Sequence, residues 1–129
     1  MASLSYNKRK GARFESDVAT FLAARTGLPV ERRHLAGADD RGDLSGVSVA
    51  GRPCVVECKN TAALDLAGHL REAEVERDNA GAAFGVVVQK RRGVSDAGSA
   101  FVIMTLETFA DIVNAAQVGG LPTGIAIGI

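Results

Sequence analysis

Residues 43–59, DLSGVSVAGRPCVVECK, decide the fold that this sequence predicts. Residues 43–49 alternate between polar and apolar side chains, as in a β-strand with one buried face. Residues 50–53, AGRP, are typical of a turn, because glycine and proline interrupt regular structure. Residues 54–59, CVVECK, form a β-rich run. The stretch therefore predicts two consecutive strands joined by a short turn.

Helices and further strands are predicted on both sides of this stretch. In residues 12–26, apolar side chains such as Phe14 and Val18 recur at helical spacing, and Gly27 and Pro29 end the pattern. The other expected elements are a short strand at 30–35, a loop at 37–42, a helix at 64–79, an apolar strand at 83–89, a turn at 93–99, a strand at 101–104 and a helix from the N-cap Thr105 to about Ala116. The order αβββαββα predicts an α/β fold with a mixed β-sheet flanked by helices.

The length of 129 residues fits one compact domain. We expect a mobile, basic N-terminal arm at residues 1–11, a globular domain at 12–116 and an apolar, glycine-rich tail at 117–129. That tail could be an edge strand, an interface segment or disordered. Its residues 125–129, IAIGI, are apolar, and an exposed run of this kind often marks an interface.

The sequence predicts a cytoplasmic protein, in a bacterium or a phage-infected host, with no membrane partner. No apolar run follows a basic start near the N-terminus, and no stretch approaches the roughly 20 apolar residues of a membrane helix. Cys54 and Cys58 lie about 13 Å apart along one predicted strand, too far for a disulfide. We expect both to be buried, reduced thiols.

The formal net charge is zero, which alone argues against a nucleic-acid-binding protein. The positive charges are clustered, however, on either side of a group of carboxylates. Each cluster alone could be a solvated surface. Together they predict phosphate contacts from Lys8, Arg9, Lys10, Arg13, Arg32, Arg33 and Lys90.

Charged side chains occupy the two predicted strands. Asp43 begins the first strand, and Glu57 and Lys59 lie two residues apart in the second. Alternate side chains of a strand share a face, so Glu57 and Lys59 point one way while Val56 and Cys58 point into the core. Glu57 and Lys59 alone would indicate an ion pair on an edge strand. Asp43 on the preceding strand favours a functional site, because charges on an apolar strand need polar partners.

These residue types predict a site for Mg²⁺, which prefers oxygen ligands and is usually bound by one or two carboxylates with water and phosphate. Asp43 and Glu57 would supply the carboxylates, and the backbone carbonyl of Cys58 is a further candidate ligand. Lys59 would orient the attacking water and stabilise charge that develops on a phosphate. Glu15 flanks the core-facing side of the first helix and could reach the metal directly or through water. The alternative for Glu15 is an ordinary acid in the first turn of a helix.

Four short segments together resemble the motifs of the PD-(D/E)XK nucleases. They are Arg13-Phe14-Glu15, Gly42-Asp43-Leu44, Val55-Val56-Glu57-Cys58-Lys59 and Gln89-Lys90. Within that superfamily the chain most resembles the archaeal-type Holliday-junction resolvases and related phage resolvases, over roughly residues 8–115. One departure is Gly42, which stands where the family usually has proline.

The resemblance implies a restriction-endonuclease-like fold and a catalytic set of Glu15, Asp43, Glu57 and Lys59. It also implies dependence on Mg²⁺ or Mn²⁺, a homodimer and paired nicks across four-way DNA junctions. Two alternatives stay open: a restriction-like or repair nuclease that acts on linear DNA, and a DNA-binding module without activity. Small size favours junction resolution, because no expected helix has the character of a major-groove reader.

Overall fold

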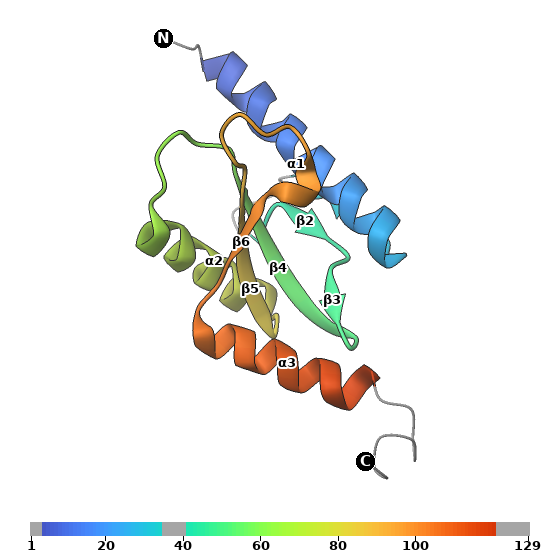
Figure 1. Cartoon of the computed structure of the whole chain (residues 1–129). Coiled ribbons are helices and arrows are strands. Elements are labelled where there is room, and N and C mark those ends of the chain that lie inside the picture. The colour runs from blue at the N-terminus through green and yellow to red at the C-terminus, as the bar shows by residue number, and fades with distance from the viewer. Residues whose placement is uncertain (1–3, 35–40, 121–129) are drawn as a thin grey trace.

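The computed structural model describes residues 4–34 and 41–120 of the chain. Its helices are α1 (Leu4–Thr26), α2 (Leu66–Ala80) and α3 (Leu106–Gly120), with a short 3-10 helix η1 (Ala97–Ser99), and its strands are β1 (Glu31–Arg32), β2 (Leu44–Ser45), β3 (Ser48–Val49), β4 (Arg52–Lys59), β5 (Phe84–Gln89) and β6 (Phe101–Ile103). Figure 1 shows the helices arranged around a central sheet. The predicted class, an α/β fold with a mixed sheet flanked by helices and consistent with a restriction-endonuclease-like fold, is confirmed.

The main sheet has the strand order β3-β4-β5-β6, and β1 pairs with β2 beside it. β4 and β5 are parallel, so they need a crossover connection, and α2 provides it. The β3–β4 and β5–β6 pairs are antiparallel. The register places Glu57 beside Val87 and Lys59 beside Gln89. Glu57 and Lys59 do form an ion pair, but β4 is an inner strand, so the edge-strand position that the alternative expected is wrong.

The two faces of β4 meet different partners, as strand alternation predicts. Val56 and Cys58 pack in the hydrophobic core with Phe14 of α1. On the opposite face, the Lys59 ammonium lies 2.7 Å from Glu72 of α2. Helices α1 and α2 therefore cover opposite sides of the sheet, and the charged residues of β4 lie beneath α2.

The first helix is longer than predicted. It begins at Leu4 instead of residue 12, so the part of the expected mobile arm that the structure describes is helical. The expected boundary followed the apolar pattern, which starts at Phe14. Lysine and arginine have high helix propensity, and no proline interrupts residues 4–11, so the helix continues beyond its packed part. Lys8 and Arg9 consequently lie on a helix.

Two other predicted elements have different bounds. The strand expected at 43–49 is divided into β2 and β3 at Gly46, whose φ of 87° is incompatible with continuous strand pairing. The last helix has the expected N-cap, since Thr108 N donates to Thr105 Oγ1 at 3.1 Å, but it extends to Gly120. Residues 117–120 are therefore helical, and the apolar segment 125–129 lies outside the described residues.

Both cysteines are free and buried, as expected. Burial raises the pKa of Cys54 to about 11 and raises that of Cys58 as well, so both thiols stay protonated and unreactive at neutral pH. Within the described ranges, no helix combines the length and the apolar character that crossing a membrane would require.

Candidate active site

Asp43 is held against β4 by backbone hydrogen bonds. Its amide donates to the Val56 carbonyl at 2.9 Å, and its carbonyl accepts from the Arg33 amide at 2.7 Å. The Cys58 amide also donates to Asp43 Oδ2 at 2.7 Å. Gly42 permits this approach, because a Cβ there would lie 2.8 Å from a methyl group of Val55. Glycine thus has a structural reason to precede Asp43.

Glu57 is the most deeply buried member of the predicted catalytic set. Its residue exposure is 6%, and its Oε2 has no hydrogen-bond partner among the described residues. Its Oε1 lies 3.3 Å from the Lys59 ammonium. A buried carboxylate oxygen without a donor is unfavourable unless a cation or a water satisfies it. This oxygen is therefore a candidate metal ligand.

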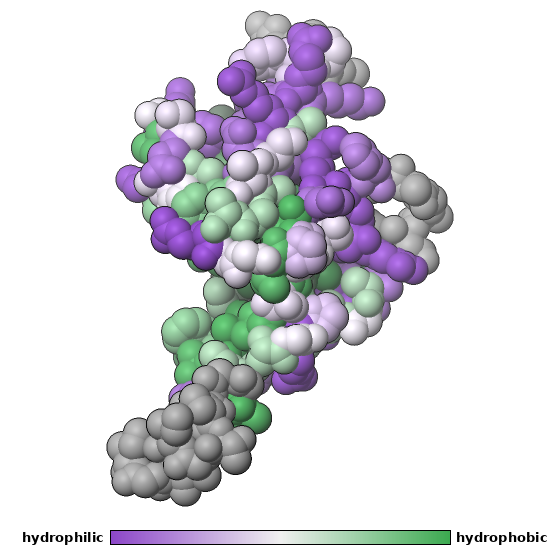
Figure 2. Space-filling model, turned by 90° about the vertical axis from the view of Figure 1, so that its right-hand side faces the viewer, coloured by the Kyte–Doolittle hydropathy of each residue, from purple (hydrophilic) through white to green (hydrophobic). Residues whose placement is uncertain are grey.

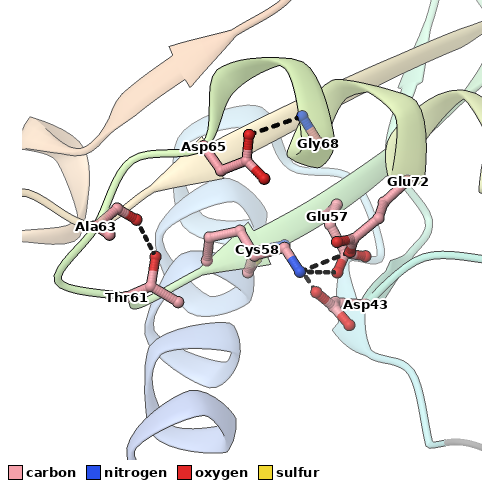
Figure 3. A network of polar contacts seen from close by, with 9 residues as sticks. Asp43, Glu57, Cys58, Thr61, Ala63, Asp65, Gly68 and Glu72 are labelled. Carbon is pink, nitrogen blue, oxygen red and sulfur yellow. Dashed lines mark hydrogen bonds and ion pairs between the residues drawn. The ribbon is translucent and has the colours of Figure 1, made fainter.

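Helix α2 adds two carboxylates that the sequence analysis missed, Glu72 and Glu76. The helix begins at the N-cap Asp65, whose Oδ1 accepts from the Gly68 amide at 3.0 Å. Glu57, Glu72 and Glu76 each place a carboxylate oxygen within 4.8 Å of the other two. Figure 3 shows the side chains of Asp43, Glu57 and Glu72 converging beside β4.

A sequence signal for these two glutamates exists. Glu72 and Glu76 are four residues apart and flank Ala73, which belongs to the apolar stripe of the predicted helix and is fully buried. Side chains at this spacing lie on the same face of a helix. Two acids beside the buried stripe indicate that α2 presents carboxylates to the sheet.

The carboxylates strongly affect the titration of Asp43. Burial, the charge of Glu57 and the charge of Glu15 outweigh the Cys58 amide and raise the pKa of Asp43 to about 8. Burial would lower the pKa of Lys59, but its hydrogen bond to Glu72 and the charge of Glu57 raise it, so the ammonium stays charged. An excess of negative charge in a partly buried site favours cation binding.

Glu15 lies near this group but has a partner of its own. Its Oε2 is 2.7 Å from Nε of Arg32, and its charge contributes to the raised pKa of Asp43. The structure thus places Glu15 close enough to affect Asp43, in an ion pair with a residue that was expected to contact phosphate. The pair occupies one carboxylate oxygen of Glu15 and one nitrogen of Arg32, and the other oxygen and the other nitrogens are not part of it.

The basic residues form one compact group and several separate positions. Lys10 and Arg13 of α1 line an open hollow of about 440 Å³ together with Lys90, which follows β5. The Lys90 ammonium donates to the Val94 carbonyl at 3.1 Å. Lys8 and Arg9 are exposed on α1. Figure 2 shows hydrophilic side chains concentrated toward the end of the molecule where α1 begins.

Arg33 differs from the other predicted phosphate contacts. Its backbone supports Asp43, and its Nε is buried with no hydrogen-bond partner among the described residues. The structure therefore groups Lys10, Arg13 and Lys90 around one hollow. It leaves Lys8 and Arg9 on the exposed end of α1. Arg32 is paired with Glu15, and Arg33 is partly buried.

Comparison with known proteins gives one result that bears on this geometry. A family model described as "Phage putative PDDEXK endonuclease" matches residues 6–79, more than half of the chain. The matched segment contains Glu15, Asp43, Glu57, Lys59 and both glutamates of α2. No curated protein and no solved structure shows a significant match.

Proposed function

The chain belongs to the phage PDDEXK endonuclease family, and from this premise we propose that it hydrolyses DNA phosphodiester bonds at Asp43, Glu57 and Lys59. Endonucleases of this family act on DNA, and PDDEXK nucleases generally use divalent metals. One observation carries the assignment of the site: Glu57 is buried on an inner strand with an unpartnered carboxylate oxygen, beside Asp43 and Lys59.

The residues at the site fit a divalent cation such as Mg²⁺, with Mn²⁺ as a substitute. Asp43 and Glu57 supply carboxylate oxygens, which hard cations prefer, and the Cys58 carbonyl is a further proposed ligand. When bound, the cation polarises the scissile phosphate and lowers the pKa of a bound water. Glu15 is proposed to act on the cation directly or through water, with the carboxylate oxygen that is not paired with Arg32.

Lys59 is proposed to stabilise the charge that develops on the phosphate and to orient the attacking water. Its ammonium is charged and shares a face of β4 with Glu57, only 3.3 Å from its carboxylate. A preorganised charge of this kind stabilises a transition state more than the ground state, because the charge on the phosphate grows during reaction.

Four-way junctions are the proposed substrate, cut by a two-fold symmetric dimer. A junction presents two equivalent strands, and one small domain with one site cannot reach both at once. An apolar surface on β6 and α3 could form the dimer contact, since Phe101, Leu106 and Phe109 have half or more of their surface exposed. Figure 2 shows apolar side chains toward the α3 end of the molecule.

Cleavage of four-way junction, flap and linear duplex DNA, compared side by side, tests this function. We expect cleavage with Mg²⁺ or Mn²⁺, none with EDTA, and paired nicks on the junction at the highest rate. Equal rates on linear and junction DNA would instead favour a restriction-like or repair nuclease. Binding without cleavage under any metal condition would favour a DNA-binding module and contradict the nuclease assignment.

The basic group on α1 yields a second test. Each phosphate contact that is lost should lower the steepness of log K against log salt by about 0.9 on duplex arms. A Lys8→Ala, Arg9→Ala, Lys10→Ala triple variant should therefore bind DNA more weakly and with a flatter salt dependence. Arg52→Ala, which removes an exposed arginine at the start of β4, is the matched control. An unchanged slope in the triple variant would show that these side chains are only solvated.

A further inference from the structure

Helix α2 directs two glutamates toward β4. The proposed site at Asp43 and Glu57 does not require either of them. Glu72 and Glu76 each have a carboxylate oxygen within 4.8 Å of one on Glu57. We infer that Glu57, Glu72 and Glu76 form a second divalent-cation subsite, adjacent to the one at Asp43 and sharing Glu57 with it. The inference deepens the proposed nuclease site and rests on that function for its role in a reaction.

This group differs from the acidic clusters that are common on protein surfaces. Glu57 and Glu76 have exposures of only 6% and 3%. In addition, Glu57 Oε2 is buried and has no hydrogen-bond donor among the described residues, whereas buried carboxylate oxygens normally have a donor or a cation. Glu72, whose side chain is 50% exposed, lies at the open side and gives solvent a route to the buried pair.

Lys59 shows that this position attracts positive charge. Its ammonium lies 2.7 Å from Glu72 Oε2 and 3.3 Å from Glu57 Oε1. The ammonium therefore contacts two of the three carboxylates of the group. If a cation replaced the ammonium at Glu72, Lys59 would be released from that contact and become available to a phosphate.

The three side chains define the class of cation. They offer only carboxylate oxygens, so the subsite suits a hard cation such as Mg²⁺ or Mn²⁺ and lacks the thiolate or imidazole ligands typical of zinc. The competing explanation is that Glu72 only positions Lys59, with no cation of its own. The two explanations differ in the number of cations that bind.

Counting bound Mn²⁺ by electron paramagnetic resonance, without DNA, separates them. The wild-type chain should bind two Mn²⁺ per chain. Glu72→Gln and Glu76→Gln should each lower the affinity for one of the two ions by on the order of tenfold or more, and should leave the affinity for the other ion unchanged. Asp43→Asn should instead lower the affinity for the other ion, and Glu57→Gln should lower the affinity for both ions. Glu74→Gln, which removes an α2 acid paired with Arg77, is the matched control and should retain two.

Circular dichroism identifies any variant that does not fold. Because Glu72 is half-exposed, Glu72→Gln is the variant least expected to disrupt folding. If the wild type binds one Mn²⁺, or if Glu72→Gln binds two Mn²⁺ with wild-type affinity, the proposed subsite is wrong and the nuclease proposal stays intact. Two ions with the expected losses but no DNA cleavage by the wild type would support the subsite and contradict the nuclease proposal.

Discussion

Replacing Glu57 with glutamine should lower the rate of DNA cleavage by about 10²-fold or more, the scale expected when one preorganised charged group is lost from a site. Glutamine has nearly the same shape but carries no charge, so a cation would lose a negatively charged ligand while the packing beneath α2 is kept. The measurement is single-turnover cleavage of a labelled junction with saturating Mg²⁺ or Mn²⁺. Glu74→Gln on α2 is the control and should cleave at the wild-type rate.

A loss of similar size is expected for Lys59→Met, which keeps the aliphatic chain and removes the ammonium. Arginine should not restore the rate, because its planar guanidinium does not reproduce a compact ammonium at 2.7 Å from Glu72 and 3.3 Å from Glu57. Undiminished cleavage by either Glu57→Gln or Lys59→Met would remove that residue from the catalytic set.

Local patterns were sufficient to predict the centre of the candidate site. A strand has a period of two residues, so Glu57 and Lys59 had to share a face wherever the strand lay. The parallel strand 83–89 was also recognisable, because its unbroken apolar run requires cover on both sides. Each of these two features depends only on residues that are close in the sequence. The structure contains the shared face of Glu57 and Lys59 and the buried parallel strand.

The contacts between distant elements could not be read from such patterns. The Glu15–Arg32 ion pair exists because β1 lies beside α1, and the Lys59–Glu72 pair because α2 crosses over β4. Periodicity shows which face of a helix is apolar, but it does not show which strand that face covers. The start of α1 at Leu4 was missed for a related reason: the added residues have helix propensity without an apolar pattern.

Titration of Asp43 should make both activity and stability depend on pH. Its pKa of about 8, against an ordinary value of 3.8, results from burial and from the charges of Glu57 and Glu15. The site must lose this proton to bind a cation, so at limiting Mg²⁺ the cleavage rate should rise about tenfold per pH unit from 6 toward 8 and then level off. Raising the Mg²⁺ concentration should move this rise to lower pH, because cation and proton compete for the same carboxylate.

The stability of the metal-free protein should change in the opposite direction. The folded state binds the Asp43 proton more tightly than the unfolded state does, so this group's contribution to stability is fully present below about pH 4 and is lost as the pH rises through 8. Asparagine cannot ionise. Asp43→Asn should therefore be less active but, without metal, more stable than the wild type at pH 8, and the difference in melting temperature should shrink toward pH 5.

Thermal unfolding of both proteins at pH 5 and pH 8, with EDTA or with Mn²⁺, measures this directly. Mn²⁺ should raise the melting temperature of the wild type more at pH 8 than at pH 5, because the Asp43 carboxylate is ionised to a much larger extent at the higher pH. The gain should be smaller for Asp43→Asn. If the two metal-free proteins show the same pH dependence, Asp43 does not hold a proton in the folded state. The repulsion among Asp43, Glu57 and Glu15 would then be relieved without protonation of Asp43.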